Sequence, residues 1–526
     1  MGRFVNPDNQ AFKFALNSEI YVDKSGLINY TNRMLCTEQR FICNSRPRRF
    51  GKSMTAAMLA AYYSKGADSD ELFSSLEISQ SPDYRKHLNK YDVIHLDIQE
   101  CIDPAGGMEK VVSYIKKEVI RELGKYYPDS VSRKDKSLFA VLSRIYDETG
   151  SQFVFIIDEW DVLIRDDANN QKVQDEYISF LRSIFKGTQA LKYTALAYMT
   201  GILPIKRQKT QSGLNNFYEY TILHAGPFAE YVGFTEEEVK ALSKKYNADY
   251  EEVKRWYDGY LLNGRHIYNP MEIVNVMQRG KFNSYWCNTC SSEVISDLIR
   301  MDLDEIKMSA LCLLAGGAVH VDVSSFNNDP ADLSFSDDVL TYLIHLGYLG
   351  YNSDNKTAFI PNEEIREEMG YAVESNPWEE MVTFVAKSQS ILDATLAENG
   401  RDVAEAIEKI HDEYVSAVKY NDENSLSSVL TLAYLSARQY YFKPIRELPS
   451  GKGFADFVYI PKPDFRDKKP AFIVELKWNR DAESAIDQIK EKNYPDSIKE
   501  YTDNILLVGI SYDRKTKMHE CRIEKL

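Results

Sequence analysis

The sequence is poor in the features that mark exported, membrane-spanning and disulfide-stabilised proteins. It has only seven cysteines in 526 residues. Their odd number and wide spacing predict reduced thiols rather than a disulfide framework. No run of about 18 apolar residues occurs, and the first 25 residues lack an apolar core of signal-peptide length. We therefore expect a cytoplasmic protein that does not cross a membrane.

Zinc ligands and positive charge are also scarce. Cys287 and Cys290 form a CxxC pair with no second pair or histidine nearby, which is too few ligands for a zinc site. The net charge of −15 argues against a generally basic surface for nucleic acid. Residues 1–60 carry +5 and residues 441–526 carry +2, so residues 61–440 carry −22. The acidic bulk thus lies between two ends that can each meet phosphate.

Length and composition indicate a globular protein of several domains. At roughly 100 to 200 residues per domain, the chain is long enough for two to four. Hydrophobic residues make up 44% and charged residues 27%, which excludes wholesale disorder. Changes in the sequence pattern predict three domains, at residues 1–228, 229–420 and 421–526.

The first domain alternates short apolar runs with amphipathic stretches. This pattern predicts an α/β fold with a parallel sheet covered by helices on both faces. The predicted helices include residues 54–65, 108–123 and 175–185, and the predicted strands are residues 40–45, 92–99, 153–158, 193–201 and 220–227.

The remaining two domains differ in pattern. Residues 229–420 read as a helical lid and middle region, in which Thr235 and Glu238 can form a capping box. Near residues 330–375 a helix followed by two short strands is typical of a winged helix. Residues 421–526 predict a second α/β unit, with the strands FADFVYIP, AFIVELKW and NILLVGISY and a helix at 482–492.

Residues 41–53 read FICNSRPRRFGKS, a strand that runs through a loop into a helix. Backbone N–H groups at a helix start form an anion site, with Lys52 placed to reach the outer phosphates of ATP and Ser53 to hold magnesium. The pattern GxxxxGK[ST] requires glycine where this sequence has Arg46, so a plain strand-to-helix turn is the alternative. The predicted phosphate-binding residues are Arg46, Pro47, Arg48, Arg49, Phe50, Gly51, Lys52 and Ser53.

A second strand, FVFIIDEWD, delivers Asp158 and Glu159 at its end. Asp158 can hold magnesium and Glu159 can act as the general base, with Asp161 as the next candidate for that role. A third strand ends at Thr200, where a sensor of the γ-phosphate would sit. Taken alone, each strand end also fits the plain edge of a sheet.

Motifs in a fixed order carry a resemblance to a known family. They are YVDKS at 21–25, RPRRFGKS at 46–53, IIDEWD at 156–161, TGI at 200–202, SGLNN at 212–216, WYDGY at 256–260 and YNP at 268–270. The chain resembles the bacterial AAA-ATPase-like family whose members carry a degenerate PD-(D/E)XK nuclease domain at the C-terminus. The family's loop also has arginine at the position of Arg46, whereas its usual tyrosine after Asp-Glu is here Trp160. The resemblance implies ATP binding and hydrolysis by an AAA-type P-loop domain with a helical lid.

Some motif residues have two readings or none. Asp23 and Lys24 precede the first strand, where AAA-type domains gather adenine contacts, but they also fit a solvated turn. Arg48 and Arg49 fit either a finger that serves a neighbouring subunit or an exposed basic loop. For Asp258 the sequence suggests no chemistry, and a buried aromatic turn is the default.

In the strand AFIVELKW, Glu475 and Lys477 are two residues apart and share one face of the sheet. Asp456 lies on the strand expected beside it. Two carboxylates can hold magnesium or manganese that activates water against a phosphodiester, while lysine stabilises the developing charge. Gln488 and Glu423 resemble further residues of such nucleases, and Ala455 replaces the motif's proline. A solvated ion pair on a strand face is the alternative.

Together these features predict an enzyme that binds and hydrolyses ATP and has a restriction-endonuclease-like domain for metal-dependent cleavage of DNA rather than RNA. Its expected partners are ATP, nucleic acid and other copies of the chain, and no membrane. The acidic middle favours an alternative, a nucleotide-gated switch or sensor whose nuclease-like domain only binds a partner. A metabolic kinase would need a second-substrate pocket, for which the sequence has no signal.

Overall fold

The computed structural model describes residues 2–205, 214–285, 304–314, 316–374, 379–414, 426, 429–431, 433–442, 444–450, 453–498 and 504–526. Contacts within the chain divide it into two compact units. The first comprises Met1–Cys290 and His320–Glu367, and the second comprises Ser291–Val319 and Glu368–Leu526. Within the described ranges, no helix has both the length and the apolar composition that a membrane crossing requires.

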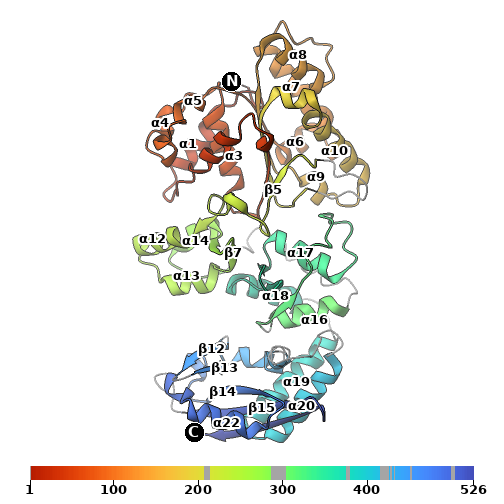
Figure 1. The fold of residues 1–526 in the computed structure, drawn as a ribbon. Coiled ribbons are helices and arrows are strands. Elements are labelled where there is room, and N and C mark those ends of the chain that lie inside the picture. The colour runs from red at the N-terminus through yellow and green to blue at the C-terminus, as the bar shows by residue number, and fades with distance from the viewer. Residues whose placement is uncertain are drawn as a thin grey trace. The chain divides into compact units, whose positions relative to one another are not determined.

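A five-stranded parallel sheet forms the centre of the first unit, which confirms the predicted α/β fold (Figure 1). Its strand order is β2-β3-β4-β1-β5, so β4 lies between β1 and β3. The strands are β1 (Phe41–Ser45), β2 (Asp92–Asp97), β3 (Phe153–Asp158), β4 (Thr194–Gly201) and β5 (Tyr218–Tyr220).

Helices cover both faces of this sheet. Helix α3 (Lys52–Tyr63) packs on β2, β3 and β4, and α1 (Gln10–Leu16) packs on α3. The other face is covered by α7 (Val111–Tyr126), α8 (Leu138–Thr149) and α10 (Gln171–Phe185) (Figure 1). The remaining helices of this layer structure are α2 (Leu27–Met34), α4 (Asp70–Phe73), α5 (Tyr84–His87), α6 (Ile98–Ala105), α9 (Val162–Arg165) and α11 (Thr188–Tyr193).

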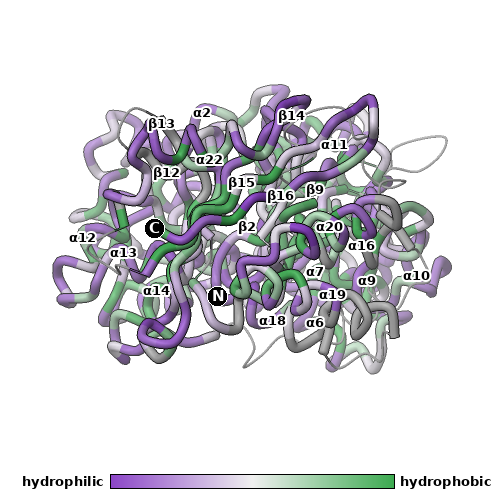
Figure 2. The backbone as a smooth tube through the Cα atoms, turned by 90° about the horizontal axis from the view of Figure 1, so that it is seen from below, coloured by the Kyte–Doolittle hydropathy of each residue, from purple (hydrophilic) through white to green (hydrophobic). Residues whose placement is uncertain are grey.

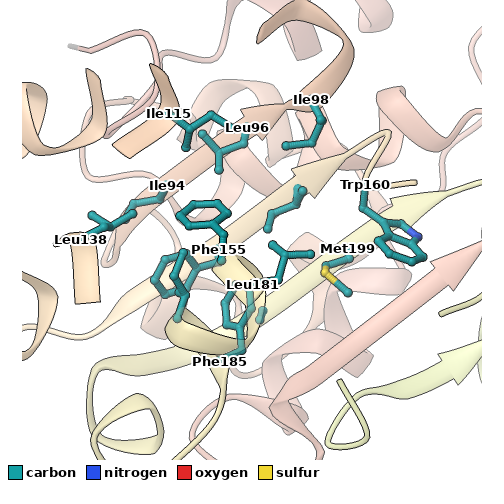
Figure 3. Close-up of a cluster of buried hydrophobic side chains, with 14 of the residues drawn as sticks. Ile94, Leu96, Ile98, Ile115, Leu138, Phe155, Trp160, Leu181, Phe185 and Met199 are labelled. Atoms are coloured by element: carbon teal, nitrogen blue, oxygen red, sulfur yellow. The ribbon is translucent and has the colours of Figure 1, made fainter. Parts of the chain in front are cut away.

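The strands read as continuous apolar runs because both of their faces are buried. All residues of β3 are buried, and its Phe155 meets Leu96 of β2 and Leu181 of α10 in one cluster (Figure 3). Trp160, just beyond β3, is fully buried at the end of the same core. This core fixes the strand ends that carry the candidate site.

The predicted strand at residues 220–227 is wrong, because β5 is only Tyr218–Tyr220. The chain turns at Thr221, whose side-chain oxygen accepts hydrogen bonds from the backbone N–H groups of Leu223 (3.1 Å) and His224 (3.2 Å). A threonine turn followed by Gly226 and Pro227 overrides the apolar pattern.

Residues 234–279 form a helical lid with a small three-stranded sheet. Thr235 and Glu238 form the predicted capping box at the start of α12 (Glu236–Tyr246). Asn269 caps α14 through its side-chain oxygen, with Pro270 at the first helical position. The other elements are α13 (Tyr250–Tyr257), α14 (Pro270–Arg279), β6 (Phe234–Thr235), β7 (Tyr260–Leu262) and β8 (Arg265–Tyr268).

A helix followed by a β-hairpin is present where the sequence predicts one. Helix α17 (Ser336–Leu346) leads into β10 (Gly350–Asn352) and β11 (Thr357–Phe359), which pair antiparallel. Neighbouring elements along the chain are α16 (Asp304–Leu314), β9 (Ala318–His320) and α18 (Glu363–Glu374).

The second unit contains a mixed sheet of order β12-β13-β14-β15-β16. Strands β14 and β15 are parallel, and the other neighbours are antiparallel. The interior strand β15 is almost wholly buried and hydrophobic, whereas the edge strand β16 is largely hydrophilic (Figure 2). The elements are β12 (Ile445–Ser450), β13 (Gly453–Tyr459), β14 (Ala471–Trp478), α22 (Ala482–Glu491), β15 (Ile505–Asp513) and β16 (Met518–Lys525).

Two helices that precede residue 420 belong to the core of this sheet. Helix α20 (Gly400–Tyr414) packs on β16 and on α19 (Glu379–Leu396). The buried side chains that these helices contribute to the core beneath β14 and β15 are Ile391, Leu392, Val403, Ile407 and Ile410. The predicted domain start at residue 421 would leave all of them out.

We expect a fragment of residues 421–526 to be unfolded and a fragment of residues 368–526 to be folded. Without α19 and α20 the sheet loses burial of five aliphatic side chains, each worth about 1.5–3 kcal/mol, and their sum is comparable with the whole stability of a typical domain. Circular dichroism and urea unfolding of both fragments test this. A cooperative transition in the shorter fragment would show that the sheet does not need the two helices.

Candidate functional site

The phosphate-loop candidate joins β1 to α3. Gly51 adopts φ of +90°, a conformation that favours glycine, directly before the first helical residue, Lys52. The Lys52 side chain is buried, and its Nζ donates a hydrogen bond to the carbonyl oxygen of Pro47 at 3.0 Å. Burial lowers the pKa of Lys52, while the carboxylates of Glu159 and Asp158 oppose that shift. The lysine therefore lies inside the loop, near two acids.

Asp158 lies at the end of β3 and is 2% exposed. Burial raises its pKa to about 6, although a hydrogen bond with the Ser53 side chain opposes the shift. Asp97, at the end of β2, is the register partner of Asp158. The pKa of Asp97 is also raised by burial. Sequence analysis missed Asp97, although the strand DVIHLD ends on this carboxylate as FVFIID ends on Asp158.

Glu159 follows β3 with φ of +48°, which is uncommon for a residue with a side chain. Its carboxylate lies 3.5 Å from Nη1 of Arg165 on α9. Asp161, the alternative general base, is fully buried and serves the backbone. It accepts hydrogen bonds from the N–H groups of Ile202 (3.2 Å) and Leu203 (2.9 Å) and pairs with Arg165 at 3.1 Å. Of the two candidates, only Glu159 lines the cavity described next.

A cavity of about 790 Å³ opens beside the loop, within the first unit. One part is polar and carries both signs of charge, with Lys52, Ser53, Asp97, Glu159 and Arg165 in its lining, together with Arg48, Arg49, Phe50 and Gly51. Another part is apolar and comes from the N-terminal segment and the lid: Phe12, Ile20, Tyr21, Val22, Phe234, Met271 and Val274. Such a mixture suits a ligand with a charged end and an apolar end.

The structure does not bring all predicted residues to this cavity. Pro47, Asp158 and Thr200 are buried behind its lining, and the Thr200 hydroxyl donates to the carbonyl oxygen of Asn44 at 2.9 Å. Asp158 still reaches the lining through its hydrogen bond with Ser53. The sensor position of Thr200 is thus at the right strand end, but its hydroxyl bonds within the sheet.

Arg46 has turned away from the cavity into the protein. Its guanidinium donates to the carbonyl oxygens of Ser45 (2.8 Å), Tyr220 (3.2 Å) and Phe228 (3.4 Å), and the side chain is 1% exposed. Burial lowers its pKa to about 10. The residue that replaces the motif's first glycine is therefore a clamp between β1, the end of β5 and the following turn.

The YVDKS segment divides between two roles. Asp23 accepts hydrogen bonds from the backbone N–H groups of Ser25 (2.8 Å) and Glu77 (2.7 Å), as expected of a turn residue. Lys24 lines the cavity, and its Nζ binds the Glu238 carboxylate at 2.6 Å and the carbonyl oxygen of Glu230 at 2.7 Å. Lys24 thus ties the N-terminal segment to the lid.

The WYDGY segment is a structural turn. The Asp258 carboxylate accepts hydrogen bonds from the Gly259 N–H at 2.6 Å and from His266 Nδ1 at 3.0 Å. Gly259 has φ of +118°, and a Cβ there would lie 2.3 Å from the carbonyl oxygen of Pro361. A side chain at this position would therefore clash with the backbone.

The second candidate site lies on β13, β14 and α22 of the second unit. Tyr459 pairs with Phe472 and Phe457 with Val474, so the next step of the register puts Asp456 beside Glu475. Asp456 accepts a hydrogen bond from the N–H of Leu476 at 2.7 Å. Lys477 Nζ donates to Glu475 Oε1 at 3.0 Å, and Gln488 on α22 donates to the same oxygen. All four predicted residues of this site are thus brought together.

Glu475 is 2% exposed, and burial together with the nearby Asp456 raises its pKa to about 7. Its Oε2 is buried and has no hydrogen-bond partner among the described residues. A buried carboxylate oxygen without a partner, beside a second carboxylate, suits a divalent cation. The described residues contain no cluster of three or more His, Cys, Asp or Glu side chains for a larger metal site. Glu423, Cys287, Cys290 and part of SGLNN (Ser212 and Gly213) lie outside the described residues.

The two candidate sites lie in segments that match known protein families. A parallel sheet with a lysine and carboxylates at its strand ends defines an ATPase-like domain, and the D…ExK set on a mixed sheet defines a nuclease-like domain. Residues 10–210 match the family described as "Predicted AAA-ATPase", and residues 421–521 match the PD-(D/E)XK nuclease superfamily. The two matches confirm the predicted resemblance, which is an AAA-ATPase-like domain followed by a C-terminal domain of the PD-(D/E)XK nuclease superfamily.

A curated relative is described as an uncharacterized protein in the vnfD 5' region of Azotobacter chroococcum mcd 1. It is 25% identical over 290 residues, which are 53% of this chain and 52% of the relative, so the match spans about half of each protein.

Two archaeal structures share only a distant similarity with the chain. The ORC2 protein of Aeropyrum pernix is 11% identical with a TM-score of 0.33, covering 72% of this chain and 100% of that one. Cdc6p of Pyrobaculum aerophilum is 12% identical with a TM-score of 0.25, covering 70% and 99%. Neither supports a statement about function.

We expect Arg46→Gly, which restores the glycine of the motif, to destabilise the protein. The change removes donors from buried carbonyl oxygens, at about 1–3 kcal/mol for each acceptor left without a partner. Urea unfolding should show that the free energy of unfolding falls by about 3 kcal/mol or more, whereas Arg48→Gly in the exposed part of the loop should have a much smaller effect. Unchanged unfolding combined with tighter ATP binding would instead mean that Arg46 only obstructs the loop.

Proposed function

We propose that the first unit binds ATP with magnesium and hydrolyses it. The observation that carries this proposal is that Lys52 and Ser53 at the start of α3 lie close to Asp158 at the end of β3, beside the cavity of about 790 Å³. The polar lining suits the triphosphate, and the apolar part between the N-terminal segment and the lid suits the adenine. Magnesium, when bound, would neutralise phosphate charge, with the Ser53 hydroxyl and the Asp158 carboxylate available to hold it.

Residues of this chain have separate tasks in that reaction. Lys52 exchanges its bond to Pro47 for a phosphate oxygen, and the start of α3 offers its N–H groups to the same phosphates. Glu159, which lines the cavity, takes the proton of the attacking water. Arg165 lies 3.5 Å from that carboxylate and orients it.

We propose that the second unit cleaves a phosphodiester of nucleic acid, with DNA as the favoured substrate. Asp456 and Glu475 would hold magnesium or manganese, which polarises the phosphate and the attacking water when bound. Lys477 stabilises the charge that develops on the phosphate, once its bond to Glu475 loosens. Gln488 positions Glu475 from α22.

One observation favours a second candidate, a nucleotide-gated switch whose nuclease-like domain only binds a partner. Lys477 and Gln488 both donate hydrogen bonds to Glu475 Oε1. The lysine and the amide of this site are therefore bonded to the protein's own carboxylate. The −22 charge of residues 61–440 also suits a regulated surface better than continuous contact with DNA. Nicking of plasmid DNA with magnesium or manganese, with and without ATP, separates the two.

We expect Lys52→Met to weaken ATP binding about 30-fold, because a charge-assisted contact worth about 2 kcal/mol is lost. Isothermal calorimetry measures this, with Lys90→Met at an exposed site as the control. Glu159→Gln should bind ATP normally and hydrolyse it about 100- to 10,000-fold more slowly, because only the base is removed. Equal affinity in wild type and Lys52→Met would refute the phosphate-loop assignment.

We expect Asp456→Ala and Glu475→Ala to abolish both manganese binding and nicking. Lys477→Ala should still bind manganese but nick about 100- to 1,000-fold more slowly, since it loses only charge stabilisation. Asp467→Ala, an exposed acid in the loop before β14, is the control and should behave as wild type. If the wild-type protein cuts neither DNA nor RNA under any of these conditions, the switch replaces the nuclease.

A further inference from the structure

A rigid hairpin tip joins β15 to β16 at residues 514–517. Asp513 pairs with Met518 across the hairpin, and its carboxylate accepts hydrogen bonds from the N–H groups of Lys515 (2.8 Å) and Thr516 (2.9 Å). The N–H of Lys517 donates to the Asp513 carbonyl oxygen at 2.8 Å. The backbone of the tip is therefore fixed from within.

The end of β14 is bonded to this tip. The N–H of Asn479 donates to the carbonyl oxygen of Tyr512 at 2.8 Å, and the side-chain oxygen of Asn479 accepts a hydrogen bond from the N–H of Arg514 at 2.9 Å. Arg480 follows directly. Four cationic side chains are thus gathered at one end of the sheet, and we call Arg480, Arg514, Lys515 and Lys517 the basic tip.

The side chains of the basic tip are exposed and have no ion-pair partner among the described residues. The adjacent acids are engaged with the backbone instead, because Asp481 caps α22 and Asp513 holds the hairpin turn. By contrast, Arg522 and Lys490 of the same unit are paired with carboxylates.

The basic tip lies at the same end of the sheet as the proposed cleavage site. Lys477 pairs with Ser511 in the β14–β15 register. Arg514 is three residues beyond Ser511 and Arg480 three beyond Lys477, so at about 3.3 Å per residue of extended chain each lies at most about 10 Å from this register pair. A nucleic-acid strand advances about 3.4 Å per nucleotide, so this distance corresponds to about three nucleotides.

We propose that the basic tip binds the phosphodiester backbone of a nucleic acid within about three nucleotides of the phosphate held at Glu475 and Lys477. The inference rests on the proposed nuclease function and adds where the strand runs. Contacts of this type set position and affinity rather than sequence preference. They also make binding depend on salt, since each neutralised phosphate releases counterions.

The test measures binding without cleavage, in the full chain carrying Asp456→Ala. Fluorescence anisotropy follows a labelled 20-nucleotide single strand and a 20-base-pair duplex between 50 and 300 mM salt. The tip variant changes Arg480, Arg514, Lys515 and Lys517 to Gln. The matched control changes Lys462, Arg466, Lys468 and Lys469 to Gln, which removes the same charge from the loop at the opposite end of β14.

We expect the tip variant to bind at least about 10-fold more weakly at 100 mM salt. Its slope of log affinity against log salt should be smaller by about 3 for the single strand, since each lost contact removes about 0.7. The control variant should stay within about twofold of the parent.

Equal losses in both variants, or no loss in the tip variant, would overturn the inference while leaving the nuclease proposal intact. Binding to neither DNA nor RNA by the parent would overturn both. A tip-dependent affinity for phosphatidylserine vesicles without affinity for nucleic acid would assign the charge to a membrane and likewise overturn the inference.

Discussion

The carboxyl ends of the strands in the parallel sheet depend on the hydrogen bonds and the ion pair of the Asp161 carboxylate. This carboxylate accepts hydrogen bonds from the N–H groups of Ile202 and Leu203 and forms an ion pair with Arg165. It therefore joins the segment after β3 to the segment after β4. Glycine at position 201 allows the two segments to approach this closely, because a Cβ there would lie 2.3 Å from an oxygen of Asp161. Buried backbone groups need such partners, and here a single side chain supplies two of them. Asp158 and Glu159 are presented between these fixed points.

Sequence patterns predicted the features that depend on local chemistry. The strand β3 was predicted with its observed bounds because six buried residues in a row leave a clear apolar signal. The capping box of Thr235 and Glu238 was predicted because its residues bond to each other across a single turn. Glu475 and Lys477 share a face because strand geometry alone requires it.

The missed features depend on contacts between distant segments. Arg46 was predicted to bind phosphate because it lies in the loop before Lys52, yet its guanidinium donates hydrogen bonds to carbonyl oxygens more than 170 residues away in the sequence. Asp97 ends an apolar strand as Asp158 does, but the register that pairs the two residues across the sheet joins distant segments of the chain. Helices α19 and α20 were assigned to the middle region because nothing local ties Ile407 to Val508, although both lie in one core.

The clamp made by Arg46 links the phosphate loop mechanically to the approach of the lid. One end of the link is the peptide that begins the loop, and the other is the carbonyl group of Phe228, six residues before β6. A displacement of the turn at Gly226–Phe228 would act on the Arg46 side chain, and the backbone of Arg46 begins the loop. The start of the loop is thus held by side-chain hydrogen bonds to the end of β5 and to the following turn. A glycine at position 46 could make neither bond.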